Sequence, residues 1–213
     1  MIRVTAFRWV PPFAQGLVRD LRVRWALEEA GLPYEVMLIG PDDQKSPRYR
    51  AMQPFGQVPA IDDDGFVLFE SRAIIRYLDE TRPGPKLTPA DPKGRAIMEQ
   101  WISVEQSNFT PPTMKIVMQQ FFGPMMGKTA DEGVIAEGLT GLDRALDVME
   151  KRLAASPFLA GEQFTLADLG YMPYLEYLAA TPSFSHVADR PAVAKWWKTI
   201  SARPSWQKAI GKG

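Results

Sequence analysis

Residues 54–71 read Pro-Phe-Gly-Gln-Val-Pro-Ala-Ile-Asp-Asp-Asp-Gly-Phe-Val-Leu-Phe-Glu-Ser, and this stretch decides how the first part of the chain folds. Two apolar runs flank the turn-forming residues 62–65, Asp-Asp-Asp-Gly, which predicts a tight β-hairpin. Pro59 lies where the first strand begins, so it removes a backbone donor there and is a candidate for a cis peptide bond. After Phe69 the apolar residues recur at helical spacing, and Ser71 is suited to cap that helix.

The polar residues at the end of this hairpin suit the zwitterionic end of an amino acid. Free amides at the helix start, together with the Ser71 hydroxyl, can bind a carboxylate, while Glu70 can bind an ammonium group. A hairpin followed by a capped helix is more often purely structural, so this stretch alone leaves both interpretations open.

Composition narrows the possible classes of function. The chain has 213 residues, of which 46% are hydrophobic, enough for one or two compact domains. The chain has 25 Lys and Arg residues and 25 Asp and Glu residues, so its charges balance. It has no basic tract of the kind that indicates a nucleic-acid partner. The absence of cysteine excludes disulfides, cysteine metal sites and a protein thiol nucleophile. No apolar run has membrane-spanning length and the N-terminus lacks a signal-peptide pattern, so we expect a cytoplasmic protein without a membrane partner.

The first eighty residues predict the element order βαβαββα. Residues 2–7 and 34–39 resemble strands, and the helical pattern of residues 17–30 between them predicts a βαβ unit with parallel strands. Residues 40–53 are polar, with a weak helical pattern at 48–52, and the hairpin follows.

Residues 81–92 hold four prolines and one glycine, a composition typical of a domain linker. The apolar spacing beyond the linker is helical, with runs at residues 93–122, 131–155, 169–180 and 190–200. Pro111-Pro112 is expected to kink or divide the first of these helices, and Thr165–Asp168 forms a capping box. The predicted fold class is therefore α/β plus all-α, with an α/β domain at 1–80 and a helical domain at 93–213.

These motifs, in this order, resemble those of the cytosolic glutathione transferases over nearly the whole chain, and most of all the phi class and related bacterial members. The segments that carry the resemblance are Lys45-Ser46-Pro47, Gln53 to Pro59, Phe69 to Ile74, Trp101 to Pro112 and Arg190 to Trp206. The resemblance implies a thioredoxin-like N-terminal domain and a helical bundle domain that bears the acceptor-substrate site. It also implies glutathione as co-substrate, no metal, and a homodimer.

The same resemblance implies a glutathione site in the first domain. Glu70 and Ser71 would hold the γ-glutamyl ammonium and carboxylate groups, in agreement with the zwitterion chemistry of the hairpin. Val58, next to Pro59, would pair its backbone with the cysteinyl amide. The three residues that would neutralise the glycine carboxylate are Gln44, Lys45 and Gln57.

The group that activates the sulfur is where the chain departs from the family pattern. Phi-like enzymes place a serine near the start of the first helix, and other classes a tyrosine or cysteine, whereas Leu17 holds that position here. Lowering a thiol pKa by two units from about 8.5 requires only about 2.7 kcal/mol, so several kinds of donor could supply it. The candidates are Trp9, Gln15, Gly16 and Arg19. Three of them have a structural alternative: Trp9 can serve packing, Gln15 can cap the helix, and Arg19 can be a solvated helix residue. The catalytic residue therefore stays open.

An apolar acceptor pocket would involve aromatic and methionine residues, although such residues at helical spacing are more often part of a core. The candidates are Phe13, Phe109, Met114, Met118 and Phe121. The lone His186 has a loop-like context and is expected to be incidental. Asp168 is expected to be structural, as the capping carboxylate.

Together these features predict a dimeric glutathione transferase that conjugates the glutathione thiolate to an apolar electrophile. One alternative is a glutathione-binding or ligand-carrying protein with little catalysis, and another is a protein-interaction module on the same scaffold. The interaction module would need none of Lys45, Gln57, Glu70 and Ser71, so their presence argues against it. The absence of cysteine argues against thiol-transfer, dehydroascorbate-reducing and maleylacetoacetate-isomerase-like members.

Overall fold

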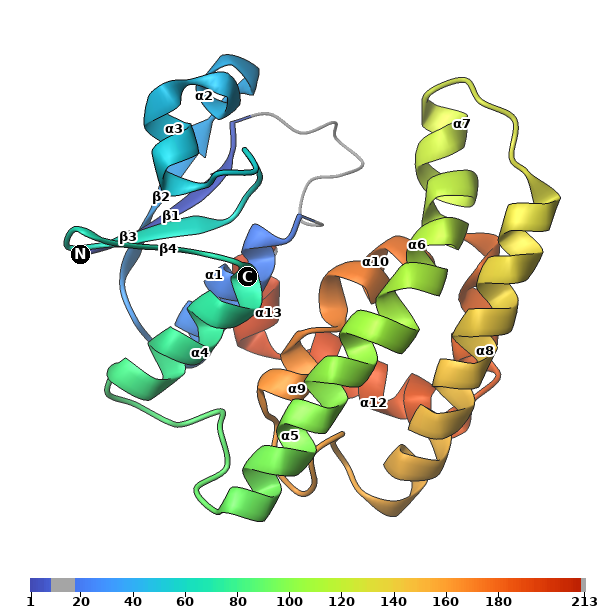
Figure 1. Cartoon of the computed structure of the whole chain (residues 1–213). Coiled ribbons are helices and arrows are strands. Elements are labelled where there is room, and N and C mark those ends of the chain that lie inside the picture. The colour runs from blue at the N-terminus through green and yellow to red at the C-terminus, as the bar shows by residue number, and fades with distance from the viewer. Residues whose placement is uncertain (9–17, 212–213) are drawn as a thin grey trace. The chain divides into compact units, whose positions relative to one another are not determined.

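The computed structural model describes residues 1–8 and 18–211, which form two compact units (Figure 1). Of these residues, 1–8, 18–88 and 203–211 form the first unit, and 89–202 form the second. The sequence predicted domains at 1–80 and 93–213 joined by a linker at 81–92, so the structure differs in where it places residues 203–211.

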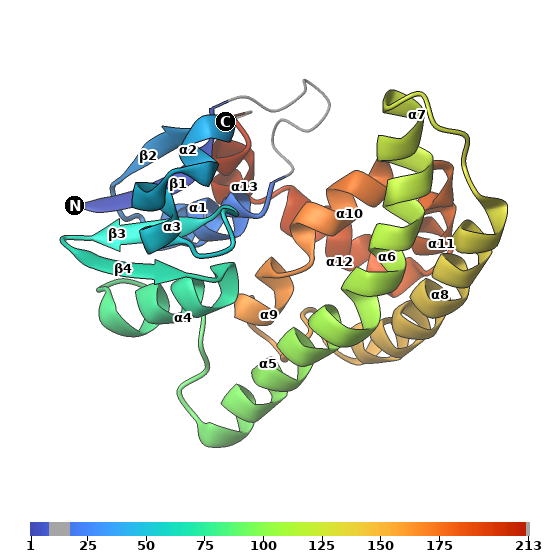
Figure 2. The same cartoon turned by 45° about the horizontal axis from the view of Figure 1, so that its top comes forward.

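The first unit is a four-stranded sheet with helices on both faces, α1 and α4 on one side and α2 and α3 on the other (Figures 1 and 2). The strand order is β2-β1-β3-β4, with β1 parallel to β2 and the other pairs antiparallel. The elements are β1 (Ile2–Phe7), α1 (Asp20–Glu29), β2 (Tyr34–Ile39), α2 (Pro41–Lys45), α3 (Pro47–Met52), β3 (Ala60–Asp63), β4 (Phe66–Phe69) and α4 (Ser71–Thr81). This confirms the predicted βαβαββα order, with α2 as an additional short helix. The core includes Val4, Leu27 and Ile74, which are fully buried.

Strands β3 and β4 form the predicted hairpin. Ala60 lies opposite Phe69 at its open end, and Asp63 lies opposite Phe66 beside the turn. The connecting residues Asp64 and Gly65 have φ values of 51° and 95°, the left-handed conformation that an Asp-Gly turn favours. The Val58–Pro59 peptide bond is cis, as the sequence predicted.

The predicted capping role of Ser71 is wrong. Helix α4 begins at Ser71, and Glu70 holds the capping position with φ 72° and ψ 109° but forms no side-chain capping bond. The first-turn amides of α4 are therefore not satisfied by the side chain of the cap residue.

Residues 203–209 pack against α1 and so belong to the first unit. Helix α13 (Pro204–Ala209) buries Trp206 completely, with its ring centroid 4.9 Å from that of Trp25. The Glu29 carboxylate accepts hydrogen bonds from Arg203 Nε at 2.6 Å and Nη2 at 2.7 Å. Helical periodicity alone cannot indicate which partner a short helix packs against, and this is why the sequence predicted the tail in the helical domain.

The second unit is all-helical, as predicted (Figure 2). Its α-helices are α5 (Pro92–Val104), α6 (Thr110–Val117), α7 (Gly123–Met125), α8 (Glu132–Ala155), α9 (Leu166–Leu169), α10 (Met172–Ala179), α11 (Ser185–Ala188) and α12 (Pro191–Ser201). Two π-helical turns, η2 (Glu105–Phe109) and η3 (Met118–Phe122), and one 3₁₀ turn, η4 (Pro182–Phe184), complete it. The predicted helix at 169–180 corresponds to α10, and the capping box before it begins a separate short helix, α9.

The proline pair at 111–112 interrupts the long helix through a π-helical turn. Neither proline carries an N–H, and the Thr110 N–H reaches back five residues to the Glu105 carbonyl. The helix direction continues into α6 with one widened turn instead of a break.

The capping box at Thr165 is present and extends further than predicted. The Thr165 N–H donates to Asp168 Oδ2 at 2.9 Å, and Asp168 Oδ1 accepts from the Leu159 N–H and from Trp196 Nε1, each at 2.9 Å. Asp168 is fully buried and so connects α9 both to α12 and to the loop after α8.

The expectation that His186 lies in a loop is wrong, while its being incidental to function stays a prediction. His186 belongs to α11, and its Nδ1 lies 2.8 Å from Asp143 Oδ1 on α8. Arg190 Nη2 lies 3.0 Å from the same oxygen, so this group of polar side chains links α8 to the chain segment that precedes α12.

Candidate functional site

The predicted binding groups come together at the open end of the β3–β4 hairpin. Because Ala60 is paired with Phe69, Pro59 and Glu70 are the next residues on the two strands and lie side by side. Val58, Pro59, Glu70 and Ser71 therefore share one region of the first unit.

The Val58 backbone lies at this position without a hydrogen-bond partner among the described residues. The residue is only 7% exposed, and no hydrogen bond to its N–H or carbonyl occurs among residues 1–8 and 18–211. Since buried backbone groups in proteins are nearly always hydrogen-bonded, this edge is suited to pairing with an extended peptide ligand.

Glu70 combines an exposed carboxylate with an unusual backbone. Its φ of 72° is rare for a residue other than glycine, and such conformations persist mainly at functional sites. Within the described part of the chain, the Glu70 carboxylate makes no hydrogen bond or ion pair. Such a carboxylate can receive an ammonium group.

Ser71 is buried beside Glu70 and faces a buried cation. The Arg22 side chain is 1% exposed, and its Nη1 lies 3.5 Å from Ser71 Oγ. An Arg N–H can only donate, so the Ser71 hydroxyl keeps its own hydrogen for an acceptor such as a carboxylate. Sequence reasoning missed Arg22, because nothing in the local pattern of α1 distinguishes it from a surface arginine.

The three residues predicted to meet the glycine carboxylate are not equivalent. Lys45, the last residue of α2, and Gln57 are both exposed. Gln44 is half-buried and its Nε2 donates to the Gly56 carbonyl at 2.7 Å, so its amide already supports the loop before β3.

Two buried hydroxyl groups lie behind this loop, those of Tyr49 on α3 and Thr5 on β1. Sequence reasoning missed both residues. The available signals were weak: Thr5 is a polar residue within an apolar strand, and Tyr49 lies in a segment with only a faint helical pattern.

Of the candidates for thiol activation, only Arg19 lies within the described residues. It is exposed and directly precedes α1. Trp9, Gln15 and Gly16 lie outside the described residues, as does the acceptor candidate Phe13.

The remaining acceptor candidates occupy different environments in the second unit. Phe109 is fully buried against Tyr171, with ring centroids 4.8 Å apart, so it forms part of the interior. Phe121 is 7% exposed and packs in an aromatic cluster with Phe122 and Tyr177. Met118 is 42% exposed and Met114 is half-buried, so these two are the more accessible of the set.

The first residue of α1 carries a buried charge. Asp20 is 4% exposed, and burial raises its pKa to about 6, although Arg24 Nη1 at 3.7 Å from its Oδ2 opposes the rise. A raised carboxyl pKa means that the folded protein holds the proton more tightly than the unfolded chain, so stability falls as the pH rises from about 4 to about 6.

Asp20→Asn is therefore expected to stabilise the protein above pH 6 by up to about 3 kcal/mol. The gain shrinks below pH 6 and vanishes below about pH 3, where the wild-type carboxyl is protonated in both states. Urea unfolding of both proteins at a series of pH values measures this difference. A gain that did not change with pH would contradict the assignment to Asp20 ionisation.

Comparison with known proteins identifies the chain. Residues 21–81 match the model of the glutathione S-transferase N-terminal domain, and residues 111–204 match that of the C-terminal domain. Glutathione S-transferase F11 of Arabidopsis thaliana is 41% identical over 194 residues, covering 89% of this chain and 91% of the relative. The chain belongs to the glutathione S-transferase family. As the F-type relatives indicate, it resembles the phi class most.

Two solved structures of this family share the fold over the whole chain. Glutathione transferase F7 of Populus trichocarpa is 32% identical with a TM-score of 0.89, and all of both chains is covered. Glutathione S-transferase I of maize, solved in complex with an atrazine glutathione conjugate, is 34% identical with a TM-score of 0.87, covering 99% of this chain and 97% of that one. The thioredoxin-like first unit and the helical second unit are thus those of a glutathione S-transferase.

Two other kinds of feature are absent from the described residues. The described residues contain no group of three or more His, Asp or Glu side chains that could hold a metal ion. Among these same residues, no helix has both the length and the apolar character needed to cross a membrane.

Proposed function

We propose that this protein is a glutathione transferase that binds the tripeptide at the open end of the β3–β4 hairpin and directs its thiolate at an apolar electrophile. The observation that carries the proposal is a set of groups beside the Ser71 hydroxyl, the Val58 backbone and the Glu70 carboxylate, which have no partner within residues 1–8 and 18–211. The maize relative solved with a glutathione conjugate supports this assignment.

In this proposal each part of glutathione meets a complementary group. Glu70 binds the γ-glutamyl ammonium and Ser71 its carboxylate, while the Val58 backbone, next to Pro59, pairs with the cysteinyl amide. Lys45 and Gln57 face the glycine carboxylate, and Gln44 shapes their loop through Gly56.

The protein contributes position and electrostatics, because it has no cysteine of its own and the reacting sulfur comes from glutathione. The thiol releases its proton to solvent, and the thiolate attacks an electrophilic carbon. As the C–S bond forms, the bond from that carbon to its leaving group breaks, or the π bond of an activated alkene opens and the adduct takes up a proton. The group that lowers the thiol pKa comes from Trp9, Gln15, Gly16 or Arg19 at the approach to α1, where a helix N-terminus also favours an anion. Met114, Met118 and Phe121 are proposed to contact the electrophile.

Titration with glutathione by calorimetry, with the ultraviolet thiolate band of the complex recorded against pH, tests this function. We expect binding and a bound thiol pKa about two units below the free value of about 8.5. Binding with an unshifted thiol pKa would favour the alternative of a ligand carrier, which the absence of a serine, tyrosine or cysteine at position 17 motivates. No binding would remove both functions.

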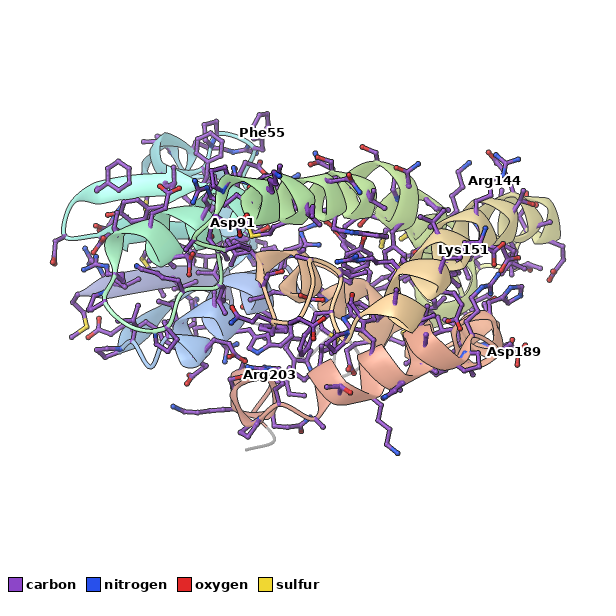
Figure 3. All side chains as sticks on the ribbon, turned by 90° about the horizontal axis from the view of Figure 1, so that it is seen from below. Phe55, Asp91, Arg144, Lys151, Asp189 and Arg203 are labelled. Atoms are coloured by element: carbon purple, nitrogen blue, oxygen red, sulfur yellow. The ribbon has the colours of Figure 1, made fainter. Side chains whose placement is uncertain are left out.

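We further propose that the protein is a cytoplasmic homodimer. The first unit exposes apolar side chains on and near its edge strand β4: Phe55 is 63% exposed and Phe66 49%, and Figure 3 shows Phe55 pointing away from the ribbon. A self-association surface would cover such a patch. Light scattering after size-exclusion chromatography is expected to give twice the monomer mass, and a monomer mass at micromolar concentration would contradict the proposal.

A further inference from the structure

The segment from Gln57 to Ala60 is held from behind by two buried hydroxyl groups. Tyr49 Oη lies 2.6 Å from the Gln57 carbonyl oxygen, and Thr5 Oγ1 lies 2.7 Å from the Ala60 nitrogen. The two hydroxyl oxygens are 3.1 Å apart. This hydroxyl relay, formed by Tyr49 and Thr5, thus holds the residues on either side of Val58–Pro59.

Counting hydrogens gives the relay one direction. Tyr49 has a single hydroxyl hydrogen, and a carbonyl can only accept, so Tyr49 donates to Gln57. The Tyr49 oxygen can then only accept from Thr5. Thr5 in turn accepts from the Ala60 N–H and shares its one hydrogen between Tyr49 Oη and the Ala60 carbonyl, which is 3.2 Å away.

The surroundings keep this arrangement rigid. Tyr49 is 4% exposed and Thr5 is fully buried, so water does not compete for these bonds. Burial raises the pKa of Tyr49, although the Thr5 hydrogen bond opposes the rise, and the phenol keeps its hydrogen at neutral pH. The Tyr49 ring packs in one apolar cluster with Val58 and Ile39, which confines the Val58 side chain as well.

The relay therefore acts on the Val58 backbone, the part of the proposed site whose orientation must be most accurate. With Gln57 and Ala60 both held, the N–H and carbonyl of Val58, which have no partner in the described part of the chain, keep a fixed direction before any ligand arrives. A binding group that is already in place avoids the ordering cost of association. Neither hydroxyl needs to touch the ligand for this effect.

We propose that Tyr49 and Thr5 are positioning residues for glutathione, which fix the Val58 backbone for pairing with the cysteinyl amide. The inference rests on the proposed function, because it concerns the same site. It adds two residues that neither the hairpin motif nor the family comparison assigns.

Tyr49→Phe tests the relay, because it keeps the ring and removes only the hydroxyl. Glutathione affinity measured by calorimetry is expected to fall about 5- to 10-fold, the effect of one lost hydrogen bond. KM for glutathione rises by the same factor while kcat stays near the wild-type value, since the Val58 contact is made equally in the ground and transition states.

Substitutions at Thr5 probe the same relay from its other end. Thr5→Val keeps the shape without the hydroxyl and is expected to weaken binding to a similar extent, whereas Thr5→Ser keeps the hydroxyl and should bind normally. The double variant Tyr49→Phe/Thr5→Val is expected to lose no more affinity than the weaker-binding single variant, because the relay is broken only once.

Tyr77→Phe is the matched control. Tyr77 also belongs to the first unit, and its hydroxyl donates to Asp63 Oδ2 at 2.7 Å, away from Gln57 and Ala60. Because Tyr77 is only half-buried, this variant is expected to lose less stability than Tyr49→Phe, and it should bind glutathione as the wild type does.

Three results would overturn the inference. Wild-type affinity in Tyr49→Phe, together with reduced stability, would show that the relay is only structural. Additive losses in the double variant would show that the two hydroxyl groups act separately. Failure of the wild-type protein to bind glutathione would overturn the proposed function and this inference together, and the wild-type titration alone identifies that case.

Discussion

Glu70→Gln is expected to lower the affinity for glutathione by about 10- to 100-fold while the free energy of unfolding stays unchanged. The substitution keeps the shape of the side chain and removes the charge that would pair with the γ-glutamyl ammonium. Stability should not change, because the carboxylate has no partner within the described chain. Calorimetry measures the binding and urea unfolding the stability.

A second substitution at this position separates the backbone from the side chain. Glu70→Gly removes the carboxylate and also suits the φ of 72°, so it is expected to raise the free energy of unfolding by about 1 kcal/mol while binding is lost. Glu80→Gln, an exposed change on the same helix, is the control and should alter neither quantity. Normal glutathione binding by either Glu70 variant would refute the site assignment.

Asp168→Ala is expected to destabilise the protein by about 4 kcal/mol or more, because it leaves several buried donors without an acceptor. These are the N–H groups of Leu159 and Thr165, the Thr165 hydroxyl and the Trp196 indole. Burial raises the pKa of Asp168, and the donated hydrogen bonds counteract that rise. Urea unfolding monitored by Trp fluorescence measures the loss.

Asp147, which also belongs to the second unit, provides a control for the Asp168 substitution. The Asp147 carboxylate accepts a hydrogen bond as Asp168 does, in this case from Arg190 Nη2 at 2.7 Å. The Asp147 side chain, however, is 63% exposed. Asp147→Ala should therefore cost less than about 1 kcal/mol, as exposed ion pairs do. Equal losses in the two variants would mean that burial does not decide the role of Asp168.

The parts of the fold that sequence predicted well are those with a strong local signal. Strands β1 and β2 have the predicted bounds, because alternation and flanking turn residues define short strands. Helix α8 begins one residue after its predicted start, next to its cap Asp131. The Asp64-Gly65 turn follows from the left-handed preference of that dipeptide.

The parts that sequence could not predict depend on contacts between distant residues. Thr5 and Tyr49 are 44 positions apart, and only the folded sheet brings their hydroxyl groups together. The link between Asp143 and His186 spans 43 positions, which explains why the histidine was expected to be incidental. Glu70 and Ser71 were found because they are adjacent and follow a recognisable hairpin, although the cap position fell one residue earlier than predicted.

The packing of α13 on α1 has a consequence for how the chain folds during its synthesis. A ribosome completes residues 20–29 long before residues 203–209. Trp25 therefore lacks its partner Trp206, and Glu29 its partner Arg203, until the intervening residues have been made. The second unit is contiguous in sequence and can complete its packing earlier, since domains fold as units during translation. The unit whose synthesis begins first therefore completes its packing last. In a nascent chain that stops before residue 203, the apolar face of α1 stays uncovered, where chaperones can bind it.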